Sequence, residues 1–268
     1  MLRRKVAVVT RSTSGAGLGI ACRFAAAGAD LAINGFDETT AAEILRQEIS
    51  DTYGVRVVFC PADVSEPYGA ARLIGDATSM LGRVDILVNY AGTRLDAAVH
   101  EFPTEQWHAT IANNLTAVFL TTRAVLPQMF ERNWGRIINV ASVSGLVATA
   151  NRAAYVASTH GVIGFTKCVA LEIAPSGITC NAICPSLSPA SRLREQRTSR
   201  FVASKRLDLV EEGAVLLEEG CPALALPGDW LGDLAKFLCS DAGAHLNGVA
   251  LPVDGGFPLD EYGFRDRL

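Results

Sequence analysis

Short apolar segments alternate with helical segments along most of this 268-residue chain. The predicted strands are apolar at nearly every position and cover residues 5–10, 30–34, 55–60, 84–90, 135–141, 177–184 and 249–254. Helical segments fall between them, at 18–28, 39–54, 66–81, 104–131, 154–174 and 229–240. Strands that are apolar on both faces are typical of parallel sheets with helices on each side. The pattern therefore predicts an α/β fold with a doubly wound parallel sheet in three α/β/α layers.

The composition fits one compact unit that works on small molecules. Hydrophobic residues make up 49% and charged residues 19%, and with no repeat or linker we expect a single domain over 1–268. The region 186–226 interrupts the strand–helix rhythm after a strand, where substrate lids occur in such folds. A net charge of −4 argues against nucleic acid or anionic membranes as partners.

The cysteines and the N-terminus point to a cytoplasmic protein. No apolar run is long enough to span a membrane, and a strand begins too early for a signal peptide. No CxxC pair occurs, and the four histidines have no matching ligand cluster, so we expect reduced thiols and no metal. The seven cysteines are Cys22, Cys60, Cys168, Cys180, Cys184, Cys221 and Cys239.

A glycine-rich turn, TRSTSGAGLGI, follows the first predicted strand and opens a helix. Glycines let backbone N–H groups approach a pyrophosphate, and the helix N-terminus adds partial positive charge. This placement between strand and helix is what gives the motif weight, because the glycines alone are weak evidence. The turn predicts a dinucleotide site in a Rossmann-type fold.

The chain resembles the short-chain dehydrogenase/reductase family over essentially its whole length. The family turn TGxxxGxG is matched at Thr10, Gly15 and Gly17, with Arg11 in place of the first glycine. Arg11 could force a local rearrangement, because positive φ is costly for a residue with a Cβ. It could also reach a ribose phosphate and favour NADP. The sequence leaves both alternatives open.

The resemblance also implies a cofactor, NAD or NADP. Gly35 stands where NAD-specific members usually carry an acidic residue, but the segment Asn34-Gly35-Phe36 matches NAD-dependent relatives, which favours NAD. The cofactor-binding residues implied are Thr10, Arg11, Ser12, Thr13, Gly15, Gly17, Phe36, Asp63, Val64, Asn89, Ala91, Gly92 and Pro185.

The family's proton-transfer pattern is a serine followed by YxxxK. Ser142 precedes Tyr155 by the usual thirteen positions, but the lysine position is Thr159. A free tyrosine has a pKa of about 10, which a neighbouring ammonium lowers. Threonine cannot supply that charge, which is worth roughly 3–4 kcal/mol at 4–5 Å and an effective dielectric of about 20. Asn114 matches the asparagine that supports the lysine through water, so the implied catalytic set is Ser142, Tyr155, Asn114 and Thr159.

Matches outside the cofactor turn resemble the bacterial D-3-hydroxybutyrate dehydrogenases in particular. The positions implied to bind substrate are Arg94, Ser144, Arg152, Leu187, Gln196 and Phe257. Arg152 stands for a carboxylate-binding lysine, a workable exchange, although a plain surface role for Arg94 and Arg152 stays open. The family pattern also implies a homo-oligomer, as a tetramer.

Three functions remain open at this point. The first is an oxidoreductase with an altered site, acting on a small hydroxy acid or on a larger carbonyl or imine. The second is a catalytically impaired dinucleotide-binding or scaffold protein, as Arg11 and Thr159 suggest. The third is non-redox chemistry on the same fold, such as dehydration or isomerisation.

Overall fold

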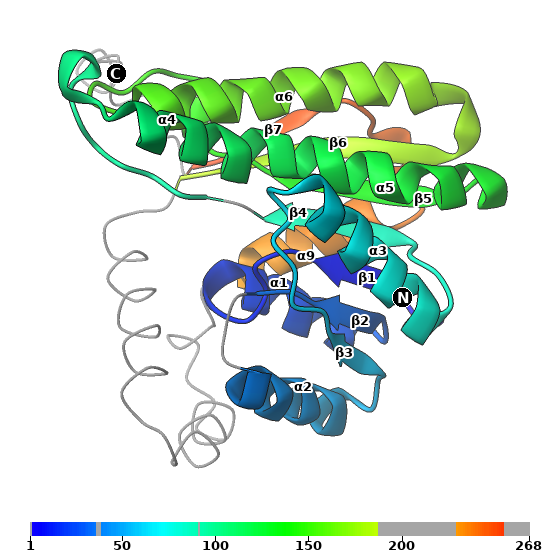
Figure 1. The fold of residues 1–268 in the computed structure, drawn as a ribbon. Coiled ribbons are helices and arrows are strands. Elements are labelled where there is room, and N and C mark those ends of the chain that lie inside the picture. Colours follow the sequence, from blue (N-terminus) through cyan, green and yellow to red (C-terminus); the bar gives the residue numbers. More distant parts are fainter. Residues whose placement is uncertain (1, 36–38, 91, 187–228, 255–268) are drawn as a thin grey trace, which may run out of the picture.

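The computed structural model describes residues 2–35, 39–90, 92–186 and 229–254. Within them one sheet has the order β3-β2-β1-β4-β5-β6-β7, and every neighbouring pair is parallel (Figure 1). The strands are β1 (Val6–Val9), β2 (Asp30–Ile33), β3 (Val57–Phe59), β4 (Ile86–Tyr90), β5 (Gly135–Val140), β6 (Ile178–Pro185) and β7 (Ala250–Val253). The predicted parallel α/β sheet is confirmed.

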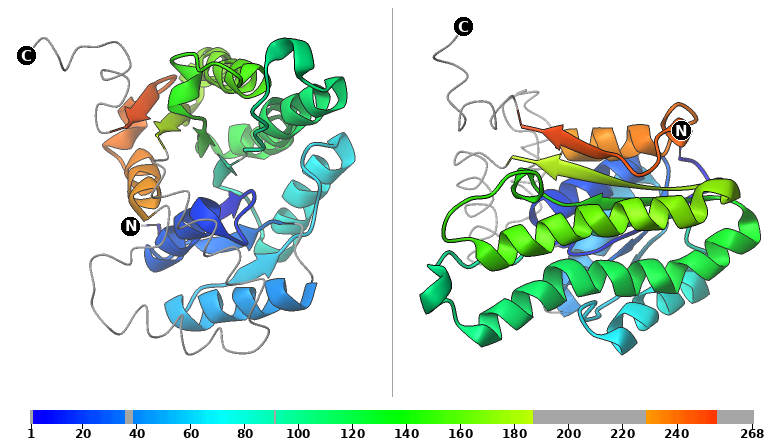
Figure 2. Two further views of the ribbon diagram at one scale, coloured as in Figure 1. Left: turned by 90° about the vertical axis from the view of Figure 1, so that its left-hand side faces the viewer. Right: turned by 90° about the horizontal axis from the view of Figure 1, so that it is seen from above.

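Helices cover both faces of this sheet, as Figure 2 shows from two further sides. They are α1 (Gly15–Ala26), α2 (Thr39–Tyr53), α3 (Pro67–Leu81), α4 (Thr104–Ile111), α5 (Ala117–Arg132), α6 (Ala153–Ile173) and α9 (Asp229–Leu238). Successive residues of a strand face opposite sides. Ala7 and Val9 of β1 accordingly pack in the core beneath α1, α2 and α9, whereas Val6 and Val8 pack in the core beneath α3, α5 and α6. The three-layer arrangement is therefore built from strands buried on both sides.

The region predicted as one helix over 104–131 is interrupted in the structure. A π-helical turn, η2 (Ala112–Thr116), joins α4 to α5 without breaking the helical path. Such turns hold an extra residue and occur frequently at functional sites. Here the turn carries two asparagines, Asn113 and Asn114, which apolar periodicity along the segment does not reveal.

The chain winds outward from β1 through β2 to β3, then returns to place β4 on the other side of β1. The strand order therefore reverses between β1 and β4, and in open parallel sheets ligands bind beside the carboxyl ends of the strands at such a point. Among the described residues, no helix combines the length and apolar character needed to cross a bilayer.

Candidate active site

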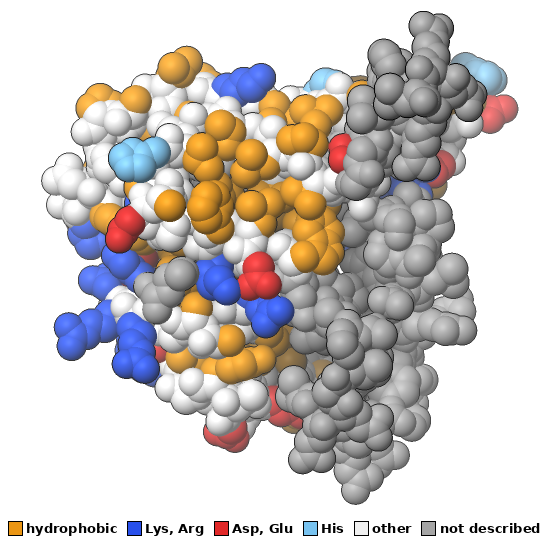
Figure 3. All heavy atoms as spheres, turned by 180° about the vertical axis from the view of Figure 1, so that it is seen from behind, with side chains coloured by type: hydrophobic (Ala, Val, Ile, Leu, Met, Phe, Trp, Pro, Cys, Tyr) orange, Lys and Arg blue, Asp and Glu red, His pale blue; other side chains and the backbone are white. Residues whose placement is uncertain are grey.

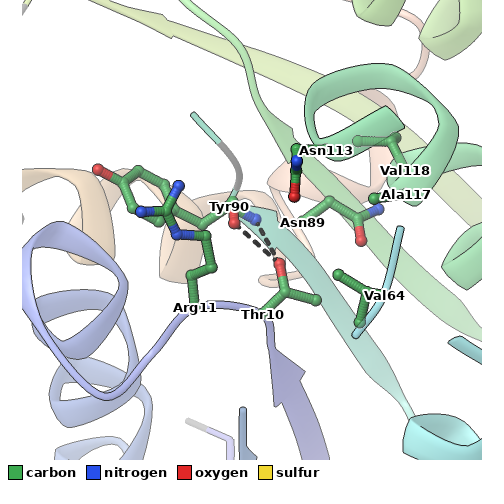
Figure 4. Close-up of a pocket in the computed structure, with 8 residues that line it drawn as sticks. All are labelled: Thr10, Arg11, Val64, Asn89, Tyr90, Asn113, Ala117 and Val118. Carbon is green, nitrogen blue, oxygen red and sulfur yellow. Dashed lines mark hydrogen bonds between the residues drawn. The ribbon is translucent and has the colours of Figure 1, made fainter. Parts of the chain in front are cut away.

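A pocket lies at this reversal point (Figure 4). It is lined by Thr10, Arg11, Val64, Asn89, Tyr90, Asn113, Ala117 and Val118. These residues come from the carboxyl ends of β1 and β4, the segment after β3, the π-helical turn and the first turn of α5. Five of them belong to the cofactor set predicted from sequence or adjoin it, whereas Asn113, Ala117 and Val118 were missed because they lie on a segment read as plain helix.

Thr10 fixes the two central strands to one another at the pocket floor. Its hydroxyl donates to the carbonyl of Tyr90 at 3.0 Å and accepts from the backbone N–H of Tyr90 at 2.9 Å. Figure 4 shows both bonds as dashed lines between Thr10 and Tyr90, beside the Arg11 side chain. Thr10 is buried, and its hydroxyl links the carboxyl ends of β1 and β4.

The glycine-rich turn keeps its tight form although Arg11 replaces a glycine. Arg11 has φ of 49° and Gly15 has φ of 56°, both in the left-handed region. A Cβ on Gly17 would lie 2.1 Å from the carbonyl oxygen of Arg11, so α1 packs directly on the turn. Arg11 therefore adopts the conformation a glycine would have, at a cost on the order of 1–2 kcal/mol.

The N-terminus of α1 fits the phosphates of a dinucleotide. Its N-cap residue, Ser14, makes no side-chain capping hydrogen bond, and no acidic residue stands in the first turn. The partial positive charge and N–H groups of this helix end are therefore not neutralised by the helix's own side chains. Together with the adjoining pocket, this suits a bound pyrophosphate.

Asn34, which sequence reasoning did not single out for a role, organises the base of the turn. Its side-chain amide donates to the carbonyls of Cys60 and Ala62, each at 3.0 Å, and its Oδ1 accepts from the backbone N–H of Arg11 at 3.3 Å. The Ser12 hydroxyl accepts from Asn34 N at 3.0 Å. Asn34 thus joins the loops that follow β1, β2 and β3, and Ser12 is buried among them.

A buried polar chain supports the β4 side of the pocket. Asn89 donates from Nδ2 to Asn139 Oδ1 at 2.9 Å, and Thr121 donates to Asn89 Oδ1 at 2.7 Å. Asn139 in turn donates to Thr166 on α6 at 2.9 Å. Asn89 was predicted from the family pattern, whereas Asn139 and its partners needed the register that pairs β4 with β5.

Of the other predicted cofactor-binding residues, some lie at the pocket or at strand ends and some lie outside the described residues. Asp63 is exposed, and its Oδ1 accepts from both the N–H and the hydroxyl of Ser65, while Val64 lines the pocket. Gly92 follows β4 and Pro185 ends β6. Five predicted site residues lie outside the described residues: Phe36, Ala91, Leu187, Gln196 and Phe257. The predicted lid, 186–226, also lies outside them apart from Ser186.

Ser142 and Tyr155 lie on two segments that pack against each other. Ser142 follows β5 and caps the short helix η3 (Val143–Gly145), where its Oγ accepts from Ser144 N at 3.1 Å. Tyr155 stands half-buried in the first turn of α6. A Cβ on Gly145 would lie 2.8 Å from the carbonyl oxygen of Thr159, so glycine permits η3 to approach α6 one turn after Tyr155.

The polar side chains around Thr159 form hydrogen bonds with one another and with the backbone of α6. Thr159 is 4% exposed, and its hydroxyl donates to the carbonyl of Tyr155 at 2.9 Å. The Ser158 hydroxyl donates to the same carbonyl at 2.8 Å and accepts from Asn114 Nδ2 at 3.1 Å. Asn114 also accepts from Thr93 N at 3.0 Å. Asn114 therefore links the loop after β4 to α6 directly, through Ser158, rather than facing a lysine.

Two other side chains with chemistry of their own adjoin this region. Burial raises the pKa of Cys184 to about 11, partly opposed by a hydrogen bond from the backbone of Ser142, so this thiol stays protonated. His160 is exposed, and its Nδ1 lies 3.0 Å from the carbonyl oxygen of Val156 one turn earlier. The His160 ring therefore contacts the backbone of its own helix. One residue after Thr159, it is rotated by about 100° around the helix and faces a different side.

Arg152, predicted at a carboxylate-binding position, and Arg94, predicted to bind substrate, meet at one acidic residue. Arg94 Nε lies 2.9 Å from Asp96 Oδ1, and Arg152 Nε lies 3.4 Å from Asp96 Oδ2. Arg152 is the N-cap residue of α6, one turn before Tyr155, and Ser144 is buried beside Ser142. Sequence reasoning missed Asp96, whose only signal is its position two residues after Arg94.

Comparison with known proteins places this arrangement in a family. Residues 5–200 match the family model described as short chain dehydrogenase. The chain is 45% identical over 260 residues to a D-beta-hydroxybutyrate dehydrogenase of Cupriavidus necator, covering 96% of this chain and 99% of that protein. It is 38% identical to the enzyme of the same name from Rhizobium meliloti, covering 94% and 98%. A 2-(R)-hydroxypropyl-CoM dehydrogenase of Xanthobacter autotrophicus is 34% identical, covering 94% and 98%.

The match spans the glycine-rich turn, the π-helical turn and the Ser142–Tyr155 segments alike. Relatives of this similarity cover nearly the whole chain, which agrees with the parallel sheet and the pocket at its reversal point. The chain is therefore a member of the short-chain dehydrogenase/reductase family of oxidoreductases.

Proposed function

We propose that this protein is an NAD(P)-dependent oxidoreductase that interconverts a small hydroxy acid and its keto acid, with the 3-hydroxybutyrate–acetoacetate pair as the first substrates to test. The single observation that carries the proposal is the pocket at the β1–β4 reversal beside the uncapped N-terminus of α1. The names of the D-beta-hydroxybutyrate dehydrogenases support the substrate class.

A bound nicotinamide dinucleotide would supply the hydride acceptor or donor. Its adenosine end and phosphates would rest against the turn of Arg11, Gly15 and Gly17, beside Val64. The NGF segment that precedes α2 favours NAD over NADP. Arg11 is exposed at the pocket, so its guanidinium could instead contact the ribose phosphate that distinguishes NADP from NAD. A direct comparison of NADH and NADPH binding decides between the two.

Ser142 and Tyr155 would handle the substrate oxygen and its proton. The N–H of Ser144 occupies an acceptor position of the Ser142 hydroxyl, which leaves the hydroxyl proton to donate to the substrate oxygen. Tyr155 would give a proton to that oxygen during reduction and take it back during oxidation. The guanidinium groups of Arg94 and Arg152 would hold the substrate carboxylate.

Thr159 would then tilt the balance between the two directions. Thr159 carries no charge, so it cannot stabilise a phenolate at Tyr155 as an ammonium group would. We therefore propose that alcohol oxidation, in which Tyr155 would accept a proton, is the direction that gains most from a cation at position 159.

The first test is calorimetric titration of the whole protein with NADH and, separately, NADPH. Micromolar binding of one of them identifies the cofactor and supports the proposal. Turnover of acetoacetate and of larger carbonyl or imine substrates follows, with Tyr155→Phe as the matched variant that removes only the hydroxyl. Absence of binding by both dinucleotides, or turnover unchanged in Tyr155→Phe, would contradict the proposal and favour a scaffold role or cofactor-free chemistry.

We also propose self-association into a homotetramer. Figure 3 shows hydrophobic side chains gathered over α9 and β7, the last strand of the described sheet. Trp230 and Phe237 on α9 are 42% and 44% exposed, and Leu171 on α6 is 80% exposed. Light scattering coupled to gel filtration would test this, and a monomer at micromolar concentration would refute it.

A further inference from the structure

An acidic side chain occupies the centre of the proposed carboxylate-binding site. Asp96 bridges two cations by its two oxygens, with Oδ1 at 2.9 Å from Arg94 Nε and Oδ2 at 3.4 Å from Arg152 Nε. All three side chains keep partial access to solvent, with exposed fractions of 31% for Arg94, 42% for Asp96 and 23% for Arg152. The group is therefore reachable by a small anion.

The backbone on both sides of Asp96 is anchored. Before it, Thr93 accepts from and donates to the buried side chain of Asn114. After it, the N–H of Ala97 donates to the carbonyl of Asn151 at 2.8 Å, immediately before Arg152. The loop after β4 and the segment leading into α6 are thus tied together around the carboxylate. Its place between the arginines follows from the fold and not only from the reach of two long side chains.

The contacts with Asp96 involve the Nε atoms of both arginines, so their terminal NH2 groups are the groups that would bind a ligand. Each guanidinium has five N–H donors, of which Asp96 accepts the Nε–H of Arg152, while Asp96 Oδ1 lies 2.9 Å from Arg94 Nε. The terminal NH2 groups can still hold an external carboxylate. Two guanidinium groups and one carboxylate carry a net charge of +1, which one carboxylate of a substrate neutralises.

We propose that Asp96 is a specificity-determining residue, an internal counter-anion that lowers affinity for dicarboxylates and phosphate esters more than affinity for monocarboxylates. The inference rests on the proposed function in assigning Arg94 and Arg152 to the substrate carboxylate. Coulomb energy scales with the product of the charges. Asp96 therefore opposes a dianion about twice as strongly, in free energy, as a monoanion at the same distance.

The test compares anion binding by the wild-type protein and Asp96→Asn, at pH 8 and constant ionic strength. The probes are butyrate and succinate, which have four carbons each and carry one and two charges. Binding is followed by NMR signals of the arginine Nε–H groups, which needs neither cofactor nor turnover. Asp76→Asn is the matched control, because it removes the same charge from an exposed Arg72–Asp76 pair on α3.

Asp96→Asn is expected to raise affinity for butyrate about threefold and for succinate by more, up to about tenfold, because the second carboxylate of succinate is also repelled by Asp96 but lies farther from it. Asp96→Ala should give the same order, Arg152→Gln should weaken both anions, and Asp76→Asn should leave both within about twofold. Equal gains in affinity for the two anions would overturn the proposal. Weaker binding of both anions would also overturn it, because it would show that Asp96 holds the two arginines in place and does not repel the ligand.

Failure of this inference is distinguishable from failure of the proposed function. Binding of neither anion by any variant would overturn the inference. Dinucleotide binding together with Tyr155-dependent turnover of an uncharged carbonyl would still uphold the oxidoreductase site. Conversely, selective anion binding without dinucleotide binding would uphold the role of Asp96 and refute the enzyme function.

Discussion

Replacing Asn34 by alanine should destabilise the protein more than most single substitutions. The side chain is 2% exposed and connects the ends of three strands, donating to Cys60 O and Ala62 O at 3.0 Å and accepting from Arg11 N at 3.3 Å. A buried backbone group left without its partner costs about 1–3 kcal/mol. The Arg11 contact is longer and partly buried, so two carbonyls account for most of the loss.

We expect the free energy of unfolding to fall by about 2–4 kcal/mol in Asn34→Ala. For a chain of this size that lowers the melting temperature by roughly 4–8 °C. Urea unfolding with an unchanged m-value would measure the loss as a shift of the midpoint. Asn113→Ala is the control, because the Asn113 side chain makes an exposed hydrogen bond, donating to Ala109 O, one helical turn earlier, at 2.8 Å. A difference of less than about 0.5 kcal/mol between the two variants would refute the reasoning.

Two further predictions concern charge at the site and buried thiols. Thr159→Lys should raise alcohol oxidation near pH 7 by about tenfold to a hundredfold and move the pH–rate profile toward lower pH. Thr159→Met, similar in length but uncharged, should not, and an equal gain in both rules out a charge effect. Burial raises the thiol pKa values to about 11 for Cys60 and Cys184 and to about 12 for Cys180 and Cys239. The folded state then holds protons that the unfolded state loses, so urea stability should decline from about pH 9 upward. The same decline in Cys180→Ala and Cys239→Ala would assign it to other groups.

Local sequence was enough to predict the three-layer fold, the glycine-rich turn and the two segments that carry Ser142 and Tyr155. A strand buried on both faces and a glycine-rich turn each act over a few residues, so the parallel sheet and the turn at Gly15 and Gly17 could be read directly. The Ser142–Tyr155 spacing also identified which two segments should meet, and the structure packs η3 on α6 there. The roles of those two residues stay predictions.

Other parts of the site depend on pairs far apart in the chain. Asn34 bonds to Cys60 across 26 positions, Asn89 to Asn139 across 50, and Asp96 to Arg152 across 56. No local periodicity encodes such contacts, because they arise only when strand order and register bring loop ends together. The π-helical turn is equally hidden, since one extra residue hardly alters an apolar pattern.

The sequence by itself thus determined the α/β architecture, the place of the nucleotide turn and the absence of a lysine four residues after Tyr155. Only the tertiary structure decided that Arg11 adopts the backbone of a glycine, that Thr159 turns its hydroxyl onto the helix, and that Asp96 divides its carboxylate between two arginines. The physical reason is that burial and periodicity are properties of short segments, whereas hydrogen-bond and charge partners are set by which segments the sheet brings together.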